Sequence, residues 1–436
     1  MQIPSFGRWR TFASARYRPF QAIAIGQAFT ISFAADALYV PLLLRLGAPV
    51  SLVILVGSTP FAATALQALL PQILLRMRGN LRRLTLLLSL AELRGFVFAA
   101  IVAAIVTGAV DSQLGIVLIS LTVATAQTAG MLSGVNISFW TAVVLSEHER
   151  RMVGPRMGAA TMAMSTLLLL PSGALLDAGL RQVGLWIYVI FFLVGGFAAM
   201  LIPLAAARLP RPGRVLVKSG AHAEGPLPAP FRRFTHAVAI AGLGQGLIPY
   251  ASMYAISVLG ASPGFALALA GSTSAGALIG SLATGSFLAL GSSSRVLRAS
   301  MLLRTVSAVI CASAIPGNPI ALPLLVVGSA LFYGAGTAGG LAANERLYRL
   351  APPDLRVRCQ SYFVATTSAA VGGGALICAT ALLLVPAVGW GVYTTMYLGS
   401  GVARLVAGLR TDVSPTWRSP SAPSAEELEA EGLHLR

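Results

Sequence analysis

The chain alternates long apolar segments with short basic ones, and this alternation constrains its fold more than any other feature. An α-helix rises 1.5 Å per residue, so about 20 mostly apolar residues cross the roughly 30 Å hydrocarbon core of a bilayer. We expect twelve such helices, at residues 20–46, 51–75, 84–107, 114–145, 157–176, 184–207, 235–259, 265–290, 296–315, 320–344, 361–385 and 389–409. The sequence therefore predicts an all-α membrane protein with twelve transmembrane helices.

The composition agrees with this prediction. Of 436 residues, 56% are hydrophobic and 10% charged, with a mean hydropathy of +0.79, whereas about 25% of an average soluble chain is charged. The net charge of +17 is carried by short basic clusters between the apolar segments, which argues against nucleic acid as a partner. The three cysteines have no CxxC spacing, so we expect no disulfide framework, metal or cofactor.

The basic residues predict the orientation, because arginine and lysine are retained on the cytoplasmic side of a membrane. With both termini inside, 27 of the 31 basic residues are cytoplasmic, including the four from Arg404 to the C-terminus. Only Arg45 and Arg181 then fall outside. Four arginines precede an apolar stretch of about 25 residues, which is longer than the core of a signal peptide, so the first helix should remain as an anchor. We expect a multi-pass protein of the inner (plasma) membrane with both termini cytoplasmic.

A loop rich in proline, glycine and charge divides the twelve segments six and six. The loop after the fourth segment resembles the loop after the tenth at a shift of 205 residues, and GNLRRLTLL resembles SSRVLRASMLL at a shift near 215. Shared arginines in any two cytoplasmic loops would explain part of this likeness, but the order favours a duplicated six-helix unit. The expected regions are an N-terminal arm (1–18), a bundle (19–208), a linker (209–234), a second bundle (235–410) and a disordered tail (411–436).

This organisation resembles the major facilitator superfamily over residues 18 to 410. The loop LLRMRGNLRRL resembles the family pattern GxxxDRxGRR through Gly79, Arg82 and Arg83, although Arg76 stands near the place of the usual aspartate. In LLLLPSGALLDAGLR, a proline and a neighbouring glycine resemble a motif of family exporters. The resemblance implies two pseudo-symmetric six-helix bundles that form a secondary transporter and alternate access to a midplane cavity.

Asp36 stands alone in a run without other charges from Phe20 to Leu44. A charge inside a helical span costs about 2.5 to 3.5 kcal/mol on insertion scales, so it persists only where it faces protein or water. Two interpretations remain open. Asp36 either lines the cavity as a proton-coupling or substrate-binding carboxylate, or it caps a neighbouring helix or pairs with a buried donor.

The resemblance implies that the first, fourth, seventh and tenth spans line the cavity. It assigns as substrate-cavity or proton-coupling candidates Asp36, Gln127, Gln245, Tyr250, Tyr254 and Tyr333. Glu92 and Arg94 are two residues apart, so on one regular helix they should not face each other. The resemblance implies that the third and ninth spans are peripheral. We therefore expect Glu92, Arg94 and Arg304 to be ties between helices or to extend toward the inner membrane surface, rather than to be substrate ligands. A cytoplasmic gate, or ordinary orientation charges, would account for Arg82, Arg83, Arg151, Arg356 and Glu345.

We therefore expect a secondary transporter, not an enzyme, with a small-molecule substrate, protons and the lipid bilayer as partners, acting as a monomer. Few charges in the cavity favour a neutral or amphipathic organic solute, and proton-coupled efflux is the first expectation. Movement of a lipid or lysolipid by the same fold is the alternative. No GxxxxGK[ST] pattern indicates ATP-driven transport. The histidines are scattered over loops and ends and the clustered acids lie in the tail, which leaves little support for a membrane enzyme. A scaffold or sensor has little support because the sequence shows no appended folded sensory domain.

Overall fold

The computed structural model describes residues 17–69, 81–144, 147–209, 226–248, 251–289, 293–352, 355–384 and 389–411. Within these residues, helix is the only regular secondary structure. The first half contains α2 (Arg18–Phe33), α3 (Asp36–Arg45), α4 (Val50–Ala63), η2 (Thr64–Leu69), α6 (Leu81–Ser89), η3 (Leu90–Leu93), α7 (Arg94–Val106), α8 (Ser112–Thr122), η4 (Val123–Gln127), α9 (Thr128–Val144), α10 (Glu147–Gln182), α11 (Trp186–Ala199) and α12 (Leu201–Ala206). The second half contains α14 (Ala229–Leu247), α15 (Ala251–Ser257), α16 (Pro263–Ala289), α17 (Ser293–Ala312), α18 (Ala321–Leu350), α19 (Arg356–Leu384) and α20 (Gly389–Arg410).

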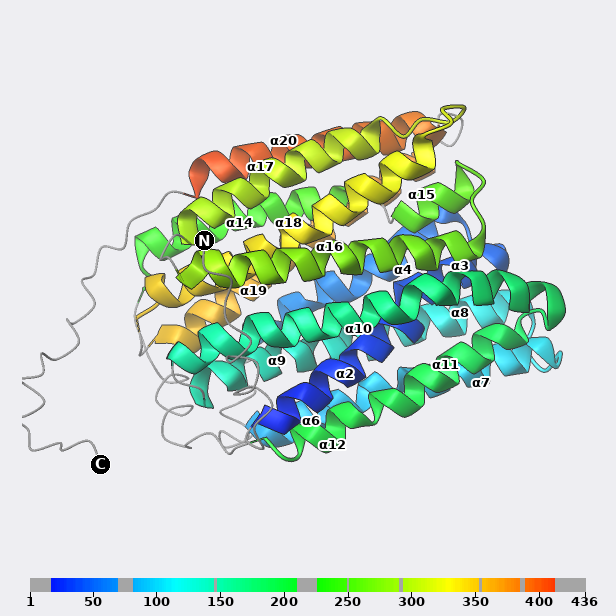
Figure 1. Cartoon of the computed structure of the whole chain (residues 1–436), viewed down its shortest axis with the longest axis horizontal. Helices are drawn as coiled ribbons and strands as arrows, with labels where there is room; N and C mark the ends of the chain where they lie inside the picture. The colour runs from blue at the N-terminus through cyan, green and yellow to red at the C-terminus, as the bar shows by residue number, and fades with distance from the viewer. Residues whose placement is uncertain are drawn as a thin grey trace, which may run out of the picture.

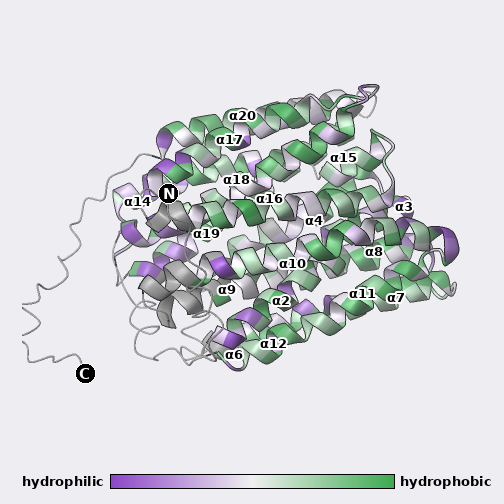
Figure 2. Ribbon diagram, viewed as in Figure 1, coloured by the Kyte–Doolittle hydropathy of each residue, from purple (hydrophilic) through white to green (hydrophobic). Residues whose placement is uncertain are grey.

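The helices run side by side along the long axis of the molecule (Figure 1). We call the end at which α2 begins and α20 finishes the terminal end, and the opposite end the far end. The helices are hydrophobic over most of their length (Figure 2), and large apolar side chains such as Leu167 and Phe197 are 71% and 64% exposed. A surface of this kind matches the hydrocarbon core of a bilayer.

Within the part of the chain that the structure describes, eight helices or continuous helical stretches are long and apolar enough to cross a membrane. The other four predicted spans, 51–75, 235–259, 296–315 and 389–409, fall on α4 with η2, α14 with α15, α17 and α20. The helices of the described residues therefore agree with twelve spans. The main difference is length: the fifth span is predicted at 157–176, but α10 extends from Glu147 to Gln182, because its basic N-terminal part continues the helix beyond the apolar segment.

The helices pack into two halves that meet along two pairs of helices. Within the first half, α2 packs against α10 and α11; within the second, α18 packs against α16 and α17, and α14 against α19 and α20. The halves meet where α10 contacts α16 and where α4 contacts α19. A Cβ added at Gly173 would lie 2.5 Å from the carbonyl oxygen of Gly264, so glycine allows α10 and α16 to approach closely.

The first helix of each half is broken near its middle. In the first half, α2 ends at Phe33 and α3 begins at Asp36; in the second, α14 ends at Leu247 and α15 begins at Ala251. Ile248 is extended, with φ −78° and ψ 113°, as expected for a residue that precedes a proline. The carbonyl oxygen of Ala34, released at the first break, accepts a hydrogen bond of 2.9 Å from Nε of Arg94. The two breaks are related by a shift of 214 residues from Ala34 to Ile248, close to the shift seen between the repeated loops.

Candidate functional site

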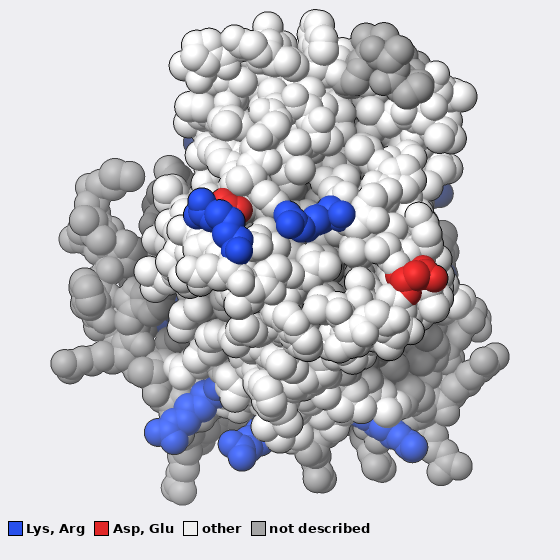
Figure 3. Space-filling model, turned by 90° about the vertical axis from the view of Figure 1, so that its right-hand side faces the viewer, with Lys and Arg blue, Asp and Glu red and all other residues white. Residues whose placement is uncertain are grey.

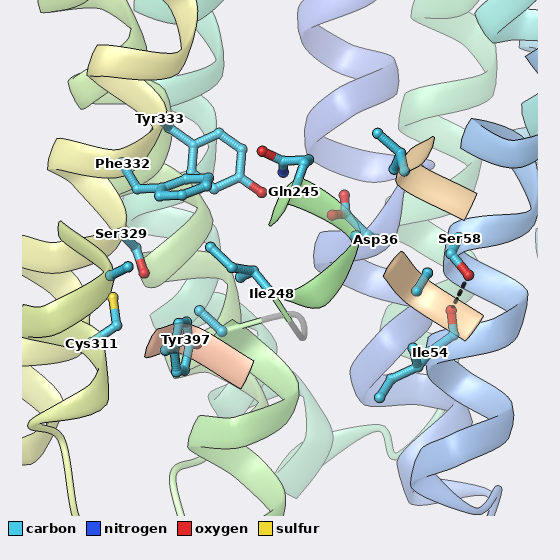
Figure 4. A pocket seen from close by; sticks show the side chains of 15 residues that line it. Asp36, Ile54, Ser58, Gln245, Ile248, Cys311, Ser329, Phe332, Tyr333 and Tyr397 are labelled. Carbon is cyan, nitrogen blue, oxygen red and sulfur yellow. Dashed lines mark hydrogen bonds between the residues drawn. The ribbon is translucent and has the colours of Figure 1, made fainter. Parts of the chain in front are cut away.

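A cavity of about 90 Å³ lies between the two halves, next to both helix breaks. The first half lines it with Asp36 from α3 and with Ile54 and Ser58 from α4. The larger side chains that the second half contributes are Gln245, Ile248, Phe332, Tyr333 and Tyr397. Figure 4 shows Asp36 on one side and Gln245, Phe332 and Tyr333 on the other. A site shared by both halves is where a relative movement of the halves would change access.

Asp36 is the first residue of α3, and its side chain is partly exposed to the cavity. Its position at a helix N-terminus favours a carboxylate, because free backbone N–H groups and the helix dipole lie there. Arg94 lies close enough to interact with it electrostatically. The break in the first helix therefore explains how a lone acid can stay inside the membrane.

The opposite wall is supported by two arginines that sequence reasoning did not connect with each other. The amide oxygen of Gln245 accepts hydrogen bonds from Arg304 of α17 and, at 3.1 Å, from Nη2 of Arg404 of α20. The guanidinium carbons of Arg304 and Arg404 lie 4.2 and 4.4 Å from the centre of the Phe332 ring, within the range of cation–π interaction. Since the arginines bind the oxygen of Gln245, its NH₂ group is left as the free end of the amide.

The position of Arg404 differs from the prediction, which counted this residue among the basic residues on the cytoplasmic side. Its side chain is completely buried, and its Nη1 donates to the carbonyl oxygens of Gly244 and Ser400, both at 3.1 Å. A side chain on a helix leans toward the helix N-terminus. Because α20 runs from the far end to the terminal end, Arg404 leans into the membrane and not toward the nearer surface.

Glu92 and Arg94 also differ from the prediction, since they pair with each other at 2.8 Å. The reason is the 3-10 segment η3, which ends just before Arg94 and interrupts the regular α-helical spacing that the prediction assumed. Both side chains are buried, and a Cβ at Gly130 of α9 would lie 2.8 Å from each of them. Together with the bond from Arg94 to Ala34, this pair joins the first, third and fourth spans.

The remaining cavity candidates are not brought together. Gln127 lies at the end of the π-helical turn η4 and is not among the residues that line the cavity. Tyr254 is buried behind the cavity wall, where its hydroxyl donates to the carbonyl oxygen of Ala314 at 2.5 Å and its ring packs against Tyr393. Tyr250 lies outside the described residues.

The residues assigned to a cytoplasmic gate lie at the terminal end. Glu345 pairs with Arg349 one turn along α18, at 3.0 Å, and this ion pair is internal to one helix. Arg83 is exposed and Arg356 is partly buried. The side chains of Arg82 and Arg151 are outside the described part of the structure.

At the far end, Asp177 joins the two halves, a contact that the sequence analysis missed. Its Oδ1 accepts from the backbone N–H of Gly264 at 2.8 Å, and its Oδ2 accepts from the hydroxyl of Ser262 at 2.7 Å. Asp177 thus belongs to α10 but caps the N-terminus of α16, where N–H groups lack helical partners. Figure 3 looks onto this end, much of which is free of charged side chains. The signal in the sequence was an acid within LLLLPSGALLDAGLR, near the end of a span.

The buried pair gives a first testable prediction. Changing Arg94 to Met leaves Glu92 without its cation and the Ala34 carbonyl without its donor, and removing one partner of a buried ion pair costs about 3 to 5 kcal/mol. Arg94→Met should therefore lower the thermal unfolding temperature of the detergent-solubilised protein much more than the double change Glu92→Gln with Arg94→Met, which leaves no unpaired charge. Equal losses in the single and double variants would show that the pair itself adds nothing.

No protein-family model and no curated protein sequence matches the chain, but solved structures resemble it over most of its length. A D-xylose–proton symporter matches with a TM-score of 0.63 and 13% identity, over 91% of this chain and 96% of the symporter. The nucleoside transporter NupG matches with a TM-score of 0.59 and 12% identity, over 91% and 98%. The human organic anion transporter MFSD10 matches with a TM-score of 0.59 and 14% identity, over 92% and 100%. These likenesses show that the chain shares the overall fold of these solved structures.

Proposed function

The chain has the fold of the major facilitator superfamily, and from it we propose a secondary transporter that moves a small organic solute by alternating access. One observation carries the proposal: a cavity between the two halves is lined by residues of both, with the lone carboxylate of Asp36 facing Gln245 and Tyr333. Rocking of one half against the other would open such a cavity to one side of the membrane at a time. The protein is a transporter in this proposal and not an enzyme.

Protons are the proposed coupling ion, with Asp36 as their carrier. When the cavity is closed, an ionised carboxylate without a counter-charge is costly inside the membrane. The halves therefore change state most easily when Asp36 holds a proton or when a cationic group of the solute pairs with it. If the two compete for the same carboxylate, protons entering the cell drive the solute out. Each proton contributes about 2.3 kcal/mol at a membrane potential of 100 mV.

For orientation, we propose that the terminal end faces the cytoplasm. Most basic residues of the described chain lie at that end, for example Arg18, Arg233, Arg298 and Arg410, whereas Arg45 and Arg181 belong to the far end. This follows the retention of positive charge on the cytoplasmic side. The Asp177 contact then closes the outer side of the pathway.

Flux in liposomes tests the proposal. The purified protein is reconstituted with an imposed pH gradient, and uptake is measured for cationic dyes, small metabolites and labelled lysolipids. We expect at least one of the water-soluble solutes to move in a manner that depends on the protein and disappears when an ionophore collapses the gradient. Liposomes without protein are the control. If protein-dependent flux ignores the gradient, proton coupling is wrong; if no solute moves, the transport proposal fails.

One observation favours a lipid substrate as the second candidate. A groove of about 780 Å³ lies between α16, α17 and α18, and most of its lining is apolar or small. Ile279 and Leu303 in its wall are 68% and 46% exposed, so it opens on the side of the bundle, and Arg295 lies in its lining. An acyl chain would fit such a surface. Protein-dependent movement of the labelled lysolipid, with none of the soluble solutes, would favour this candidate.

A further inference from the structure

The cavity has walls of opposite charge, and we propose that its substrate is a zwitterion, with a cationic group that faces Asp36 and an anionic group that faces the Gln245 wall. This inference rests on the proposed transport function and names the substrate class of that same cavity. It replaces the sequence expectation of a neutral or amphipathic solute, because that expectation treated Arg304 as peripheral and Arg404 as cytoplasmic.

The first wall carries net negative charge when Asp36 is ionised. Three ionisable residues of the described chain lie close together there: Asp36, Glu92 and Arg94. Arg94 is paired with Glu92 at 2.8 Å, so the charge of Asp36 is left over. Asp36 is also the member of the three that lines the cavity. A cationic group of a ligand can therefore approach Asp36 directly and neutralise it.

The second wall carries net positive charge. Arg304 and Arg404 converge on the amide oxygen of Gln245 and on the ring of Phe332. Neither forms an ion pair with a carboxylate of the described residues, and the Nε atom of each is buried without a hydrogen-bond partner there. Arg404 is buried and Arg304 is partly buried. Two such cations without an anion are unfavourable, so this wall would favour an anionic ligand group.

The ligand would meet this wall through the residues in front of the arginines. Gln245, Phe332 and Tyr333 line the cavity, whereas the arginines lie behind them. The oxygen of Gln245 is held by the arginines, so its NH₂ group is the end available to donate a hydrogen bond. Tyr333 interacts electrostatically with both Asp36 and Arg304, which places it between the two walls. Hydrogen-bond donors in front of two cations suit a carboxylate, a sulfonate or a phosphate ester.

A set of four isosteric ligands tests the proposal without knowledge of the natural substrate. The probes are 4-(aminomethyl)benzoate (zwitterion), 4-(aminomethyl)benzamide (cation), 4-ethylbenzoate (anion) and 4-ethylbenzamide (neutral). Binding to the purified full-length protein is measured at pH 8 by ligand-induced shift of the thermal unfolding temperature over a concentration series. The zwitterion should bind about tenfold more tightly than either singly charged probe, since close charge pairs in desolvated sites have coupling energies of this size or larger.

Variants assign each charge of the ligand to its wall. Arg304→Gln should remove the advantage of the zwitterion over the cationic probe, and Arg304→Lys, which keeps the charge, should retain part of it. Asp36→Asn should remove the advantage over the anionic probe. Arg298→Gln is the matched control, because Arg298 lies on the same helix but is exposed at the terminal end.

Two results would overturn the proposal. One is wild-type protein that binds the neutral probe as well as the zwitterion, or binds none of the charged probes. The other is an Arg304→Gln variant that binds the cationic probe as the wild type does and still prefers the zwitterion to it by the same factor. This binding experiment and the transport experiment can fail independently. The zwitterion can bind most tightly in a protein that moves no solute, and a neutral solute can still be transported by a protein that does not prefer the zwitterion.

Discussion

Asp36→Asn is expected to abolish accumulation of solute against its gradient, while solute exchange persists at higher solute concentrations, because the variant also lacks the charge that pairs with the solute. Asparagine has the shape of aspartate but cannot release or bind a proton in this range. If one proton is exchanged for each solute molecule, a gradient of one pH unit supports about tenfold accumulation in the wild type. The variant should reach no accumulation, because nothing couples its movement to the gradient.

The measurement uses reconstituted liposomes and two protocols with the same labelled solute. Gradient-driven uptake tests coupling, and counterflow with unlabelled solute inside the liposomes tests the conformational cycle alone. Asp111→Asn is the matched control, since Asp111 is an exposed acid at the far end that caps α8 of its own half. If Asp36→Asn accumulates solute as the wild type does, Asp36 is not the proton carrier and its role is structural.

Asp177→Ala is expected to open the far end of the protein. The side chain makes two hydrogen bonds to the N-terminus of α16 across the boundary between the halves. Loss of a helix cap costs about 0.5 to 2 kcal/mol. Because these bonds exist only when α10 and α16 are in contact, their loss penalises the closed state alone. A change of about 0.5 to 2 kcal/mol alters the ratio of closed to open molecules by roughly 2 to 30-fold.

Distances between two spin labels report this shift. Val183 in the first half and Ile320 in the second are 46% and 54% exposed at the far end, so cysteines there can be labelled without disturbing the core. The Asp177→Ala variant should show a larger fraction of long distances than the wild type. Asp111→Ala removes a cap within one half and should leave the distribution unchanged. An unchanged distribution in both variants would mean that the Asp177 contact does not stabilise the closed state.

The helical fold could be predicted from the sequence because the membrane imposes it. Segments such as 184–207 and 320–344 are apolar over a length that matches the bilayer, and the structure has α11 with α12 and α18 there. The resemblance to the major facilitator superfamily, drawn from the six-plus-six pattern and the basic loops, is confirmed at the level of the fold. The helix breaks were harder to predict: Ile248 precedes a proline, but the break before Asp36 has no proline or glycine in it.

The site was predicted in part. Asp36, Gln245 and Tyr333 were singled out as polar residues in helices expected to line a cavity, and all three line it. Tyr254 was chosen for the same reason, but its side chain points to Ala314 instead. Sequence assigns a residue to a helix, whereas the rotation of that helix decides which way the side chain faces.

The errors concern charged residues whose partners lie on other helices. Arg404 was five residues inside a predicted span, yet it was grouped with the cytoplasmic arginines because its direction along α20 was not considered. Asp177 was treated as part of a motif, although its partners lie 85 and 87 residues away in the chain. Such distant partners cannot be identified from one sequence.

The sequence by itself determined that the chain crosses a membrane many times as helices, since each apolar segment satisfies its own backbone hydrogen bonds and needs no other part of the chain to do so. The tertiary structure decided which charges meet: Arg304 and Arg404 behind Gln245, Asp36 across the cavity from them, and Asp177 on α16. The physical reason is that a buried charge is stabilised by atoms within a few ångströms, and helix packing brings those atoms together from distant parts of the chain.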